Sequence, residues 1–339
     1  MRTVAWMLAA ATALGVCCRL LPASLSDLPF LPWLASVTPL YAVTAALALA
    51  FTFAPRARRH RHVSRRIIRM VAIAALALET MWLAPLASSS ARVNQVLETS
   101  SAAQIRVMTC NVYKGAASAQ SIVNAVREQH VQVLALQETT VDFVEELEAA
   151  GINELLPHSE RSSSDGVYGN GVWSAYPLAD VATDDIGSSA SAMPAGTVSI
   201  EREDGSIARV RLVSVHTCSP GPGYWDLWRR SIEEIGVVRE RVATDGGLGY
   251  VLLGDFNATY DHAPFREMLG EGEAGGASLH DAAREAGQGI VATWPSGAAV
   301  PPLCGIDHVV TSGGIAATDL EALPIPGSDH TALLATLTL

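Results

Sequence analysis

Almost all of the long, nearly uncharged apolar runs fall within the first 90 residues of the chain. They cover residues 4–21, 31–55 and 70–87. Each run is close to the length of about 20 apolar residues that a helix needs to cross the hydrocarbon core of a bilayer. The pattern therefore predicts three transmembrane helices within a membrane region of residues 1–87.

Few charged residues fall inside these runs. Arg19 lies near the end of the first, and Glu79 lies near the middle of the third. An acid at that depth is costly in lipid, but the sequence offers no partner for Glu79, and we assign it no role. The first run has a second interpretation as a cleaved secretory signal, because Arg2 precedes its apolar core and the small residue Ala23 follows it.

The distribution of charge also predicts the orientation of the chain in the membrane. The first 91 residues hold nine of the 23 basic and two of the 34 acidic side chains, so they carry +7 and the remainder carries −18. Cytoplasmic loops of membrane proteins are rich in arginine and lysine. A basic cluster between the second and third runs thus predicts a cytoplasmic loop, a cytoplasmic N-terminus and an extracytoplasmic C-terminal part. A patch for nucleic acid or anionic lipid is the alternative. The cluster comprises Arg56, Arg58, Arg59, His60, Arg61, His62, Arg65, Arg66 and Arg69.

The chain changes character after the third run. Residues 88–103 are small and polar and are predicted to be a linker. From residue 104 to residue 339, short β-rich runs alternate with segments of helical spacing, which is typical of a layered α/β sandwich. The predicted strands are 105–112, 131–137, 171–174, 208–216, 250–254, 306–311 and 331–339, and the predicted helices are 119–128, 141–150 and 225–243.

Acids, amides and histidines stand at the ends of these predicted strands. Each one alone is more often a turn or capping residue than part of a site. Their repetition at five strand ends is the expected arrangement of a site in an open α/β sheet. Oxygen ligands from Asn111, Glu138 and Asp307 suit a hard divalent cation such as Mg²⁺. The full set is Asn111, Glu138, His216, Asp255, Asn257, Asp307, His308, Asp329 and His330.

Five short motifs carry a resemblance to a known family. They are TCNVYKG at 109–115, LQET at 136–139, GDFNAT at 254–259, GIDHV at 305–309 and SDH at 328–330. In this order they resemble the endonuclease/exonuclease/phosphatase family, whose fold is that of deoxyribonuclease I. The resemblance covers residues 104–339 and implies a four-layer α/β sandwich. With the apolar runs and PPLCGIDHV, it is similar to the membrane-attached bacterial branch of that family.

The resemblance implies roles at five positions around a metal ion. Asn111 and Glu138 hold Mg²⁺ or Mn²⁺, and Asp307 is a further ligand or orienting residue. Asp255 activates or orients the attacking water, and Asn257 positions the phosphate. In-line attack on phosphorus requires this combination of positioning and charge neutralisation, without a covalent nucleophile.

It also implies roles for two histidines. His330 contacts the scissile phosphate, Asp329 fixes the tautomer of His330, and His216 is a second phosphate contact. Which of Asp255 and His330 acts as the base stays open. Where the family has an arginine after a serine, this sequence has Ala175, so a phosphate contact expected there is in doubt.

Three further residues and a neighbour of Asp307 lead to separate predictions. If the strand ends converge, Cys218 and Cys304 come close, and an extracytoplasmic location permits a disulfide between them. Trp294 is a candidate for the rim of the substrate cleft. His308 points away from Asp307 on a strand and is expected to be structural.

Together these observations predict a membrane-anchored, metal-dependent phosphoesterase. The bilayer and a phosphate-ester substrate are the expected partners, and no protein partner is predicted. The substrate stays open between nucleic acid, nucleotide and phospholipid, since the charge of −18 disfavours polyanions and the tether favours lipid. A binding or scaffold module that keeps the fold is the alternative function. Three spans with one acid offer little for a transport pathway.

Overall fold

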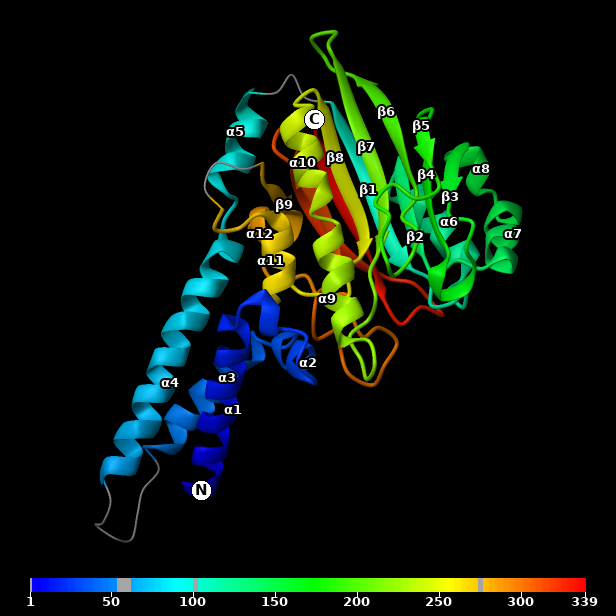
Figure 1. Ribbon diagram of the computed structural model, residues 1–339. Helices are drawn as coiled ribbons and strands as arrows, with labels where there is room; N and C mark the ends of the chain where they lie inside the picture. The colour runs from blue at the N-terminus through cyan, green and yellow to red at the C-terminus, as the bar shows by residue number, and fades with distance from the viewer. Residues whose placement is uncertain (1, 54–61, 100–102, 274–276) are drawn as a thin grey trace.

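The computed structural model describes residues 2–53, 62–99, 103–273 and 277–339. A group of N-terminal helices extends from one end of a two-sheet α/β sandwich (Figure 1). Of the predicted basic cluster, Arg56, Arg58, Arg59, His60 and Arg61 lie outside the described residues.

Three of the N-terminal helices pack side by side along their length. They are α1 (Arg2–Leu20), α3 (Leu40–Phe51) and α4 (His62–Leu83). Small side chains lie between them, which lets helix backbones approach closely. Their contact includes Ala5, Ala9, Ala48 and Ala72.

The structure does not contain three helices of membrane-spanning length among the described residues. By length and composition, two segments in this part of the chain are long and apolar enough to cross a bilayer, Thr3–Leu20 and Arg65–Glu98. The second predicted run instead forms a short helix, α2 (Leu31–Ala35), and the 12-residue α3, with Pro39 directly before α3. Twelve helical residues reach about 18 Å, which is less than the hydrocarbon thickness of about 30 Å. The second run is long enough in sequence to cross a bilayer, but it does not form one continuous helix.

The predicted linker, residues 88–103, contains regular structure. It follows the short 3-10 turn η2 (Ala84–Ala87), and α5 spans Ala91–Thr99 within it. Arg92 of α5 forms an ion pair with Glu285 and donates a hydrogen bond to the carbonyl of Ile315, 2.9 Å away. This segment is thus held against the sandwich rather than free.

Two six-stranded sheets make up the sandwich. One has the order β11-β12-β1-β2-β4-β3 and the other β5-β6-β7-β8-β10-β9. The first is built from β1 (Gln104–Asn111), β2 (Val133–Gln137), β3 (His158–Arg161), β4 (Asn170–Ser174), β11 (Ala316–Pro324) and β12 (Thr331–Thr338). The second is built from β5 (Ala179–Ala182), β6 (Ala195–Glu201), β7 (Ile207–His216), β8 (Leu248–Asp255), β9 (Leu279–Asp281) and β10 (Asp307–Ser312).

Helices cover the outer face of each sheet, which gives four layers. Separate apolar cores lie between the sheets and on each outer face, so the central strands bury side chains on both sides. The predicted layered α/β sandwich is therefore confirmed. The first sheet carries α6 (Ala119–Glu128), α7 (Val141–Ala149) and α8 (Ile152–Leu155), and the second α9 (Trp225–Glu234), α10 (Val237–Thr244) and α11 (Ala263–Leu269). The short α12 (Ala282–Glu285) contacts β9 and β10 of one sheet and β11 of the other, and its Ala282 packs in the core between the sheets.

The predicted helix over residues 225–243 is divided in the structure. Ile232, Ile235 and Val238 share one buried face. The helix nevertheless breaks at Gly236, which precedes α10, because glycine weakens a helix interior by about 1 kcal/mol. The apolar stripe continues across the break, so periodicity alone did not reveal it.

Candidate active site

The ends of the central strands bring the predicted site residues together. β7 and β8 run parallel with His216 opposite Asp255, and β10 runs antiparallel to β8 with Asp307 opposite Asp255. In the other sheet, β1 and β2 run parallel and end at Asn111 and Gln137. The two sheets are joined near this end by a hydrogen bond from Gln137 Nε2 to Ser214 Oγ, 3.1 Å long.

Close strand packing at Gly254 fixes the position of Asp255. A Cβ atom at Gly254 would lie 1.9 Å from the carbonyl oxygen of Val215 on the neighbouring strand. We expect Gly254→Ala to destabilise the fold by about 3 kcal/mol or more, because the obstacle is backbone and has no free rotamer. Thermal unfolding measures this. Gly313→Ala is the matched control, since nothing lies within 4 Å of its added Cβ; equal melting temperatures for the two variants would contradict the argument.

His330 is the centre of a buried acid–base cluster. Its Nδ1 lies 2.8 Å from Asp307 Oδ2, and its Nε2 lies 3.7 Å from Asp255 Oδ2. Burial alone would lower the pKa of His330, but the carboxylates of Asp307 and Asp255 outweigh it and raise the pKa to about 10. The imidazole is therefore held protonated beside two acids, with Nε2 toward Asp255.

The structure corrects the predicted partner of His330. Asp329, expected to fix its tautomer, lies with Oδ1 3.9 Å from Nε2, and its side chain is partly exposed. Asp307, predicted near the metal, occupies Nδ1 instead. Sequence adjacency suggested Asp329, but successive residues entering a strand point to opposite faces.

This arrangement predicts different effects for the two acids. Asp307→Asn is expected to lower kcat by about 10²- to 10⁴-fold, because the amide no longer supports the protonated, oriented imidazole. Asp329→Asn is expected to lower kcat by less than about tenfold. Steady-state kinetics of the two isosteric variants test this, and a larger loss in Asp329→Asn would restore the pairing predicted from sequence.

A second cluster joins the two sheets across the site. Asn111 Nδ2 donates to Glu138 Oε1 at 3.2 Å and to Asp255 Oδ2 at 3.0 Å, and Lys114 N donates to Glu138 Oε2 at 3.0 Å. Glu138 has a left-handed backbone (φ 59°), which turns its side chain out of β2 toward this cluster. Burial raises the pKa of Glu138 and that of Asp255.

The last two predicted site residues, His216 and Asn257, differ in how they are placed relative to the cluster. His216 Nε2 lies 3.9 Å from Glu138 Oε1 and 3.8 Å from Asp255 Oδ2, and burial lowers its pKa. Asn257 is fixed to neighbouring backbone: its Nδ2 donates to Thr217 O at 2.9 Å, and its N donates to Asp255 Oδ1 at 2.8 Å. His216 is thus part of the cluster, whereas one of the two N–H groups of the Asn257 amide is already bonded to backbone.

The donor set fits a divalent cation. Glu138, Asp255 and Asp307 bring three buried or half-buried carboxylates into one site, where mutual repulsion favours a cation. Asp307 Oδ1 is buried and has no hydrogen-bond partner in the described part of the chain. One oxygen or nitrogen from each of Asp255, Asp307 and His330 lies within 4.8 Å of the others. These are oxygen-rich surroundings of the kind that Mg²⁺ prefers.

Three residues that the sequence interpretation missed support the site. Ser328 Oγ donates to Asn111 O at 2.7 Å and accepts from His330 N at 2.9 Å. Thr293 Oγ1 accepts the backbone N–H groups of Ile306 and Asp307, both at 3.2 Å. Asn170 lies opposite Gln137 in register. Ser328 belonged to a recognised motif, but Thr293 and Asn170 had no signal without the fold.

The predicted disulfide is not formed. All five cysteines lie in the described residues and all are free. Cys218 packs with the helices outside β7, whereas the backbone of Cys304 pairs with that of Trp294 in an isolated antiparallel β-bridge. The two strand ends converge as expected, but the thiols leave them in different directions.

Two other predictions can be placed. Trp294 is 40% exposed, and the nearby Ser296 N donates to Asp329 O at 2.6 Å, which puts this loop beside the site. His308 points away from Asp307, as expected for a structural residue, with Nδ1 2.9 Å from Asp281 Oδ1 and Nε2 2.8 Å from Ala258 O.

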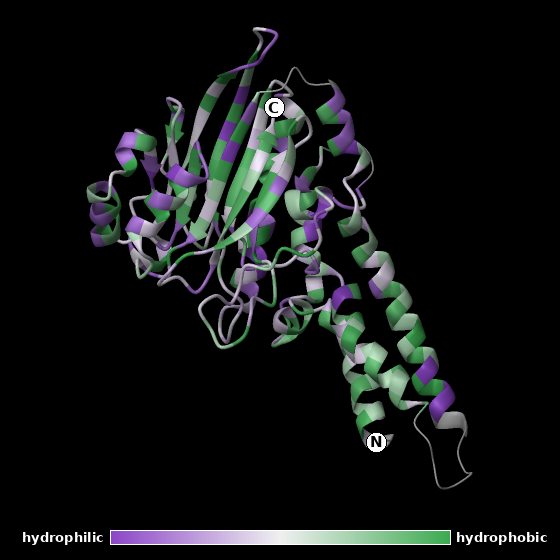
Figure 2. Ribbon diagram, turned by 180° about the vertical axis from the view of Figure 1, so that it is seen from behind, coloured by the Kyte–Doolittle hydropathy of each residue, from purple (hydrophilic) through white to green (hydrophobic). Residues whose placement is uncertain are grey.

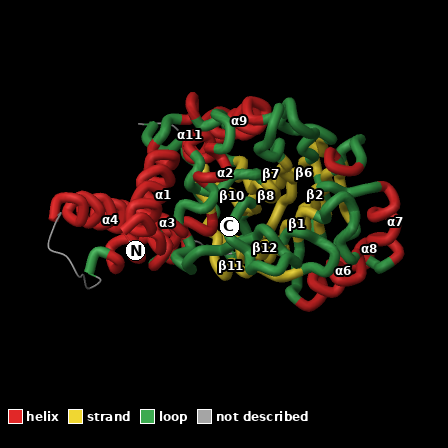
Figure 3. Tube along the Cα trace, turned by 90° about the horizontal axis from the view of Figure 1, so that it is seen from below, coloured by secondary structure: helices red, strands yellow, loops and turns green. Residues whose placement is uncertain are grey.

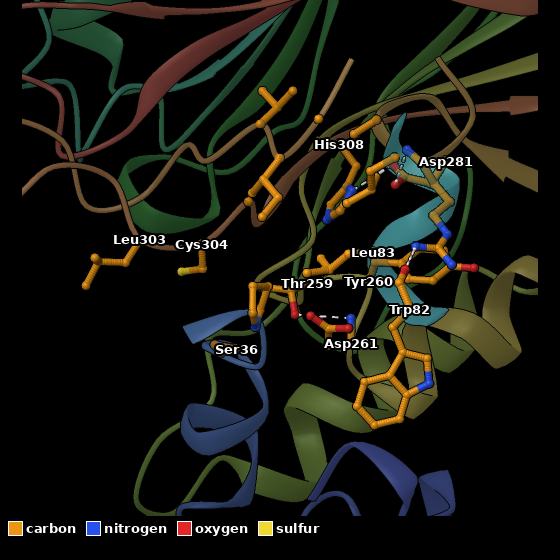
Figure 4. Close-up of a pocket in the computed structure, with 18 of the residues that line it drawn as sticks. Ser36, Trp82, Leu83, Thr259, Tyr260, Asp261, Asp281, Leu303, Cys304 and His308 are labelled. Atoms are coloured by element: carbon orange, nitrogen blue, oxygen red, sulfur yellow. Dashed lines mark hydrogen bonds and ion pairs between the residues drawn. The ribbon is translucent and has the colours of Figure 1, made fainter. Parts of the chain in front are cut away.

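A cavity separates the N-terminal helices from the loop that follows Asp255 (Figure 4). Trp82 and Leu83 line it from α4, and Thr259, Tyr260 and Asp261 line it from that loop. The cavity is also lined by Glu79, the acid to which no role was assigned. Neither carboxylate oxygen of Glu79 has a hydrogen-bond partner among the described residues. The helices therefore adjoin the segment that carries Asp255 and Asn257.

Comparisons with known proteins agree with this geometry. Residues 108–330 match the model of the endonuclease/exonuclease/phosphatase family. No curated protein matches. Truncated TDP2 from Caenorhabditis elegans is similar over 70% of this chain and 98% of its own, with 18% identity and a TM-score of 0.52. An endonuclease/exonuclease/phosphatase from Bacteroides vulgatus is similar over 69% of this chain and 98% of its own, with 18% identity and a TM-score of 0.52. TDP2 from D. rerio complexed with single strand DNA product is similar over 69% of this chain and 99% of its own, with 13% identity and a TM-score of 0.53. At these identities the solved structures support the fold alone, while the family model spans more than half of the sequence. The chain therefore belongs to the endonuclease/exonuclease/phosphatase family.

Proposed function

We propose that the chain is a membrane-anchored phosphoesterase that uses a divalent metal to hydrolyse a phosphoester bond by water attack. The observation that carries the proposal is the buried cluster in which His330 lies between Asp307 and Asp255, next to Glu138 and Asn111. Family members are hydrolases of phosphoester bonds. A scaffold module has no need of a protonated imidazole held among three acids.

We assign each residue of the site a role that fits its position and its hydrogen-bond partners. Glu138, with Asp307 or Asn111, would hold the cation, which supplies charge neutralisation at the phosphoryl oxygens. His330, protonated on both nitrogens, donates from Nε2 to a phosphoryl oxygen while Asp307 keeps Nδ1–H in place. Asp255, whose pKa is raised by burial, accepts the proton of the attacking water. His216 faces the same space with a lowered pKa and contacts the phosphate as a neutral donor.

Exposed apolar side chains support the membrane anchor. Large apolar residues face outward along all three packed helices, and Figure 2 shows these helices as mostly hydrophobic, with polar residues near the start of α4. Monomeric soluble proteins rarely expose apolar patches of this extent. The outward-facing residues include Met7, Leu14, Val43, Leu47, Ile73 and Met81.

The proposed topology places the N-terminus and the start of α4 in the cytoplasm and the sandwich outside. Arg65, Arg66 and Arg69 at the start of α4 agree with the positive-inside rule. Alkaline phosphatase fused after Ser90 is expected to be active, and the same enzyme inserted after Pro55 is expected to be inactive. The reverse pattern would overturn the topology, and activity at both sites would overturn the spans.

The bond and the substrate need a direct assay of the full chain in detergent. We expect hydrolysis of bis-p-nitrophenyl phosphate in the presence of Mg²⁺ or Mn²⁺, and comparison with p-nitrophenyl phosphate separates diesterase from monoesterase activity. Single-stranded DNA belongs in the same assay because a relative was solved with that product. The charge of −18 after residue 91 argues against a polyanionic substrate. Absence of turnover on all of these with either metal would favour the binding module.

A further inference from the structure

Three aromatic rings from distant parts of the chain form an exposed cluster at the site end of the molecule. The ring centroids of Phe30 and Trp33 are 5.6 Å apart, those of Trp33 and Trp225 5.1 Å, and those of Phe30 and Trp225 5.9 Å. Phe30 is 58% exposed and Trp33 46%. Rings in mutual contact but open to water are unusual on a soluble surface. We call Phe30, Trp33 and Trp225 the aromatic cluster.

The backbone at Phe30 points to a purpose beyond packing. Phe30 has φ 70° and ψ −14°, a left-handed conformation that is unfavourable for a bulky residue. The chain accepts this strain at a side chain that is mostly exposed, so the ring gains little burial in return. Strained residues of this kind occur where the surrounding structure holds a side chain for a function.

The segment that carries Phe30 and Trp33 contacts the two chain segments that follow His216 and Asp255. Trp33 Nε1 donates to Pro220 O at 3.0 Å, in the loop after His216. His262 Nε2 lies 2.8 Å from Pro32 O, in the segment after Asp255. Figure 1 shows α2 beside the start of α9, and Figure 3 shows α2 over the ends of β8 and β10. The aromatic cluster thus lies at the end of the sandwich where the site residues gather.

The same cluster lies where the apolar helices meet the sandwich. α1 ends at Leu20, ten residues before Phe30, and α3 begins at Leu40, seven residues after Trp33. Further exposed apolar side chains surround the cluster in sequence: Leu25, Leu28 and Tyr224. Tryptophan and other aromatic residues favour the headgroup layer of a bilayer, where one edge of the ring is wet and the other is apolar.

We infer that the aromatic cluster inserts into the headgroup layer of the outer leaflet and holds the active-site opening on the lipid surface, so that the substrate is a phosphoester of a membrane lipid. The inference rests on the proposed function. Stacking of nucleic-acid bases on the rings is the competing use, but such surfaces pair aromatic residues with a basic groove. Here the nearby arginine Arg229 is already paired with Asp27 and Glu233.

The test uses the full chain reconstituted in vesicles of phosphatidylcholine, phosphatidylethanolamine and phosphatidylglycerol. Release of phosphorylated headgroup or phosphate measures lipid hydrolysis, and bis-p-nitrophenyl phosphate measures the site itself. Phe30→Gly and Trp225→Ala are expected to lower lipid hydrolysis at least about tenfold while the soluble diester is hydrolysed within about twofold of wild type. Phe30→Gly is expected to have an equal or higher melting temperature, because glycine accepts φ 70°.

Ile207→Ala is the matched control. Ile207 is an equally exposed apolar residue at the start of β7, the end opposite His216, and its substitution is expected to change neither rate. Lipid rates in Phe30→Gly and Trp225→Ala equal to wild type would overturn the inference. So would wild-type turnover of the soluble diester without turnover of vesicle lipid, and so would faster cleavage of single-stranded DNA that falls in the same variants.

A second measurement keeps the inference separate from the proposed function. A spin label at Phe30→Cys, with the accessible Cys17 and Cys218 changed to serine, reports its depth from relaxation by oxygen and by a water-soluble nickel chelate. We expect the label to lie in the headgroup layer and a label at Ile207→Cys to lie in water. A label at position 30 in bulk water would overturn the inference even if the enzyme is active. If the label lies in the headgroup layer but the protein turns over no substrate, only the proposed function is overturned.

Discussion

Replacing His330 with alanine is expected to lower kcat for a phosphodiester by about 10³-fold while the protein stays folded. The imidazole lies 2.8 Å from Asp307 and 3.7 Å from Asp255, and their carboxylates raise its pKa to about 10. The protonated imidazole can therefore donate a charge-assisted hydrogen bond to the phosphate. Without it, the site loses the positively charged donor that faces the substrate, and Asp307 loses its hydrogen-bond partner at Nδ1.

A histidine on the surface serves as the control for this variant. His130→Asn is expected to keep the wild-type rate, because His130 is exposed and its φ of 53° suits asparagine. Circular dichroism and melting temperatures separate loss of chemistry from loss of fold. A kcat for His330→Ala within tenfold of wild type, in a protein that is folded, would remove His330 from the mechanism.

Replacing Glu138 with glutamine is expected to raise the metal concentration needed for half-maximal turnover by about 100-fold or more. The two carboxylate oxygens of Glu138 accept hydrogen bonds from Asn111 Nδ2 and from the backbone N–H of Lys114. The left-handed backbone of Glu138 directs these oxygens into the site. Glutamine keeps the size and the turn but loses the negative charge. Chelation by EDTA is expected to abolish turnover in the wild type, and added Mg²⁺ or Mn²⁺ to restore it.

Binding of Mn²⁺ followed by electron paramagnetic resonance gives a readout independent of activity. The matched variant is Glu148→Gln, an exposed acid on α7 that lies outside the site and is expected to leave the metal affinity unchanged. Equal Mn²⁺ affinity in Glu138→Gln and wild type would show that Glu138 is not a ligand.

The central strands of the fold could be predicted because they are apolar on both faces. Continuous apolar runs gave β1, β7 and β8 within two residues of their observed ends. Edge strands such as β3 and β5 could not be found this way, since they are short and half-exposed and owe their conformation to pairing with a neighbour. The break of the second apolar run into α2 and α3 was missed for a different reason: the prediction rested on the length of the apolar run and gave no weight to Pro39, which directly precedes α3.

The residues of the site could be predicted, but not all of their pairings. Parallel and antiparallel registers set Asp255 beside both His216 and Asp307, and the motifs identified all three. The partner of His330 depends instead on how the chain enters β12, which sequence order does not specify, and so Asp329 was predicted where Asp307 lies. Thr293 was missed because its role is to accept backbone N–H groups, a contact with no sequence signature.

The most direct test of the central claim is the rate of bis-p-nitrophenyl phosphate hydrolysis by the purified full chain as Mg²⁺ or Mn²⁺ is titrated, with His330→Ala measured in parallel. The account predicts turnover that saturates with metal, disappears with EDTA and is lost in His330→Ala. Turnover that is independent of metal, or that is equal in wild type and His330→Ala, would contradict it.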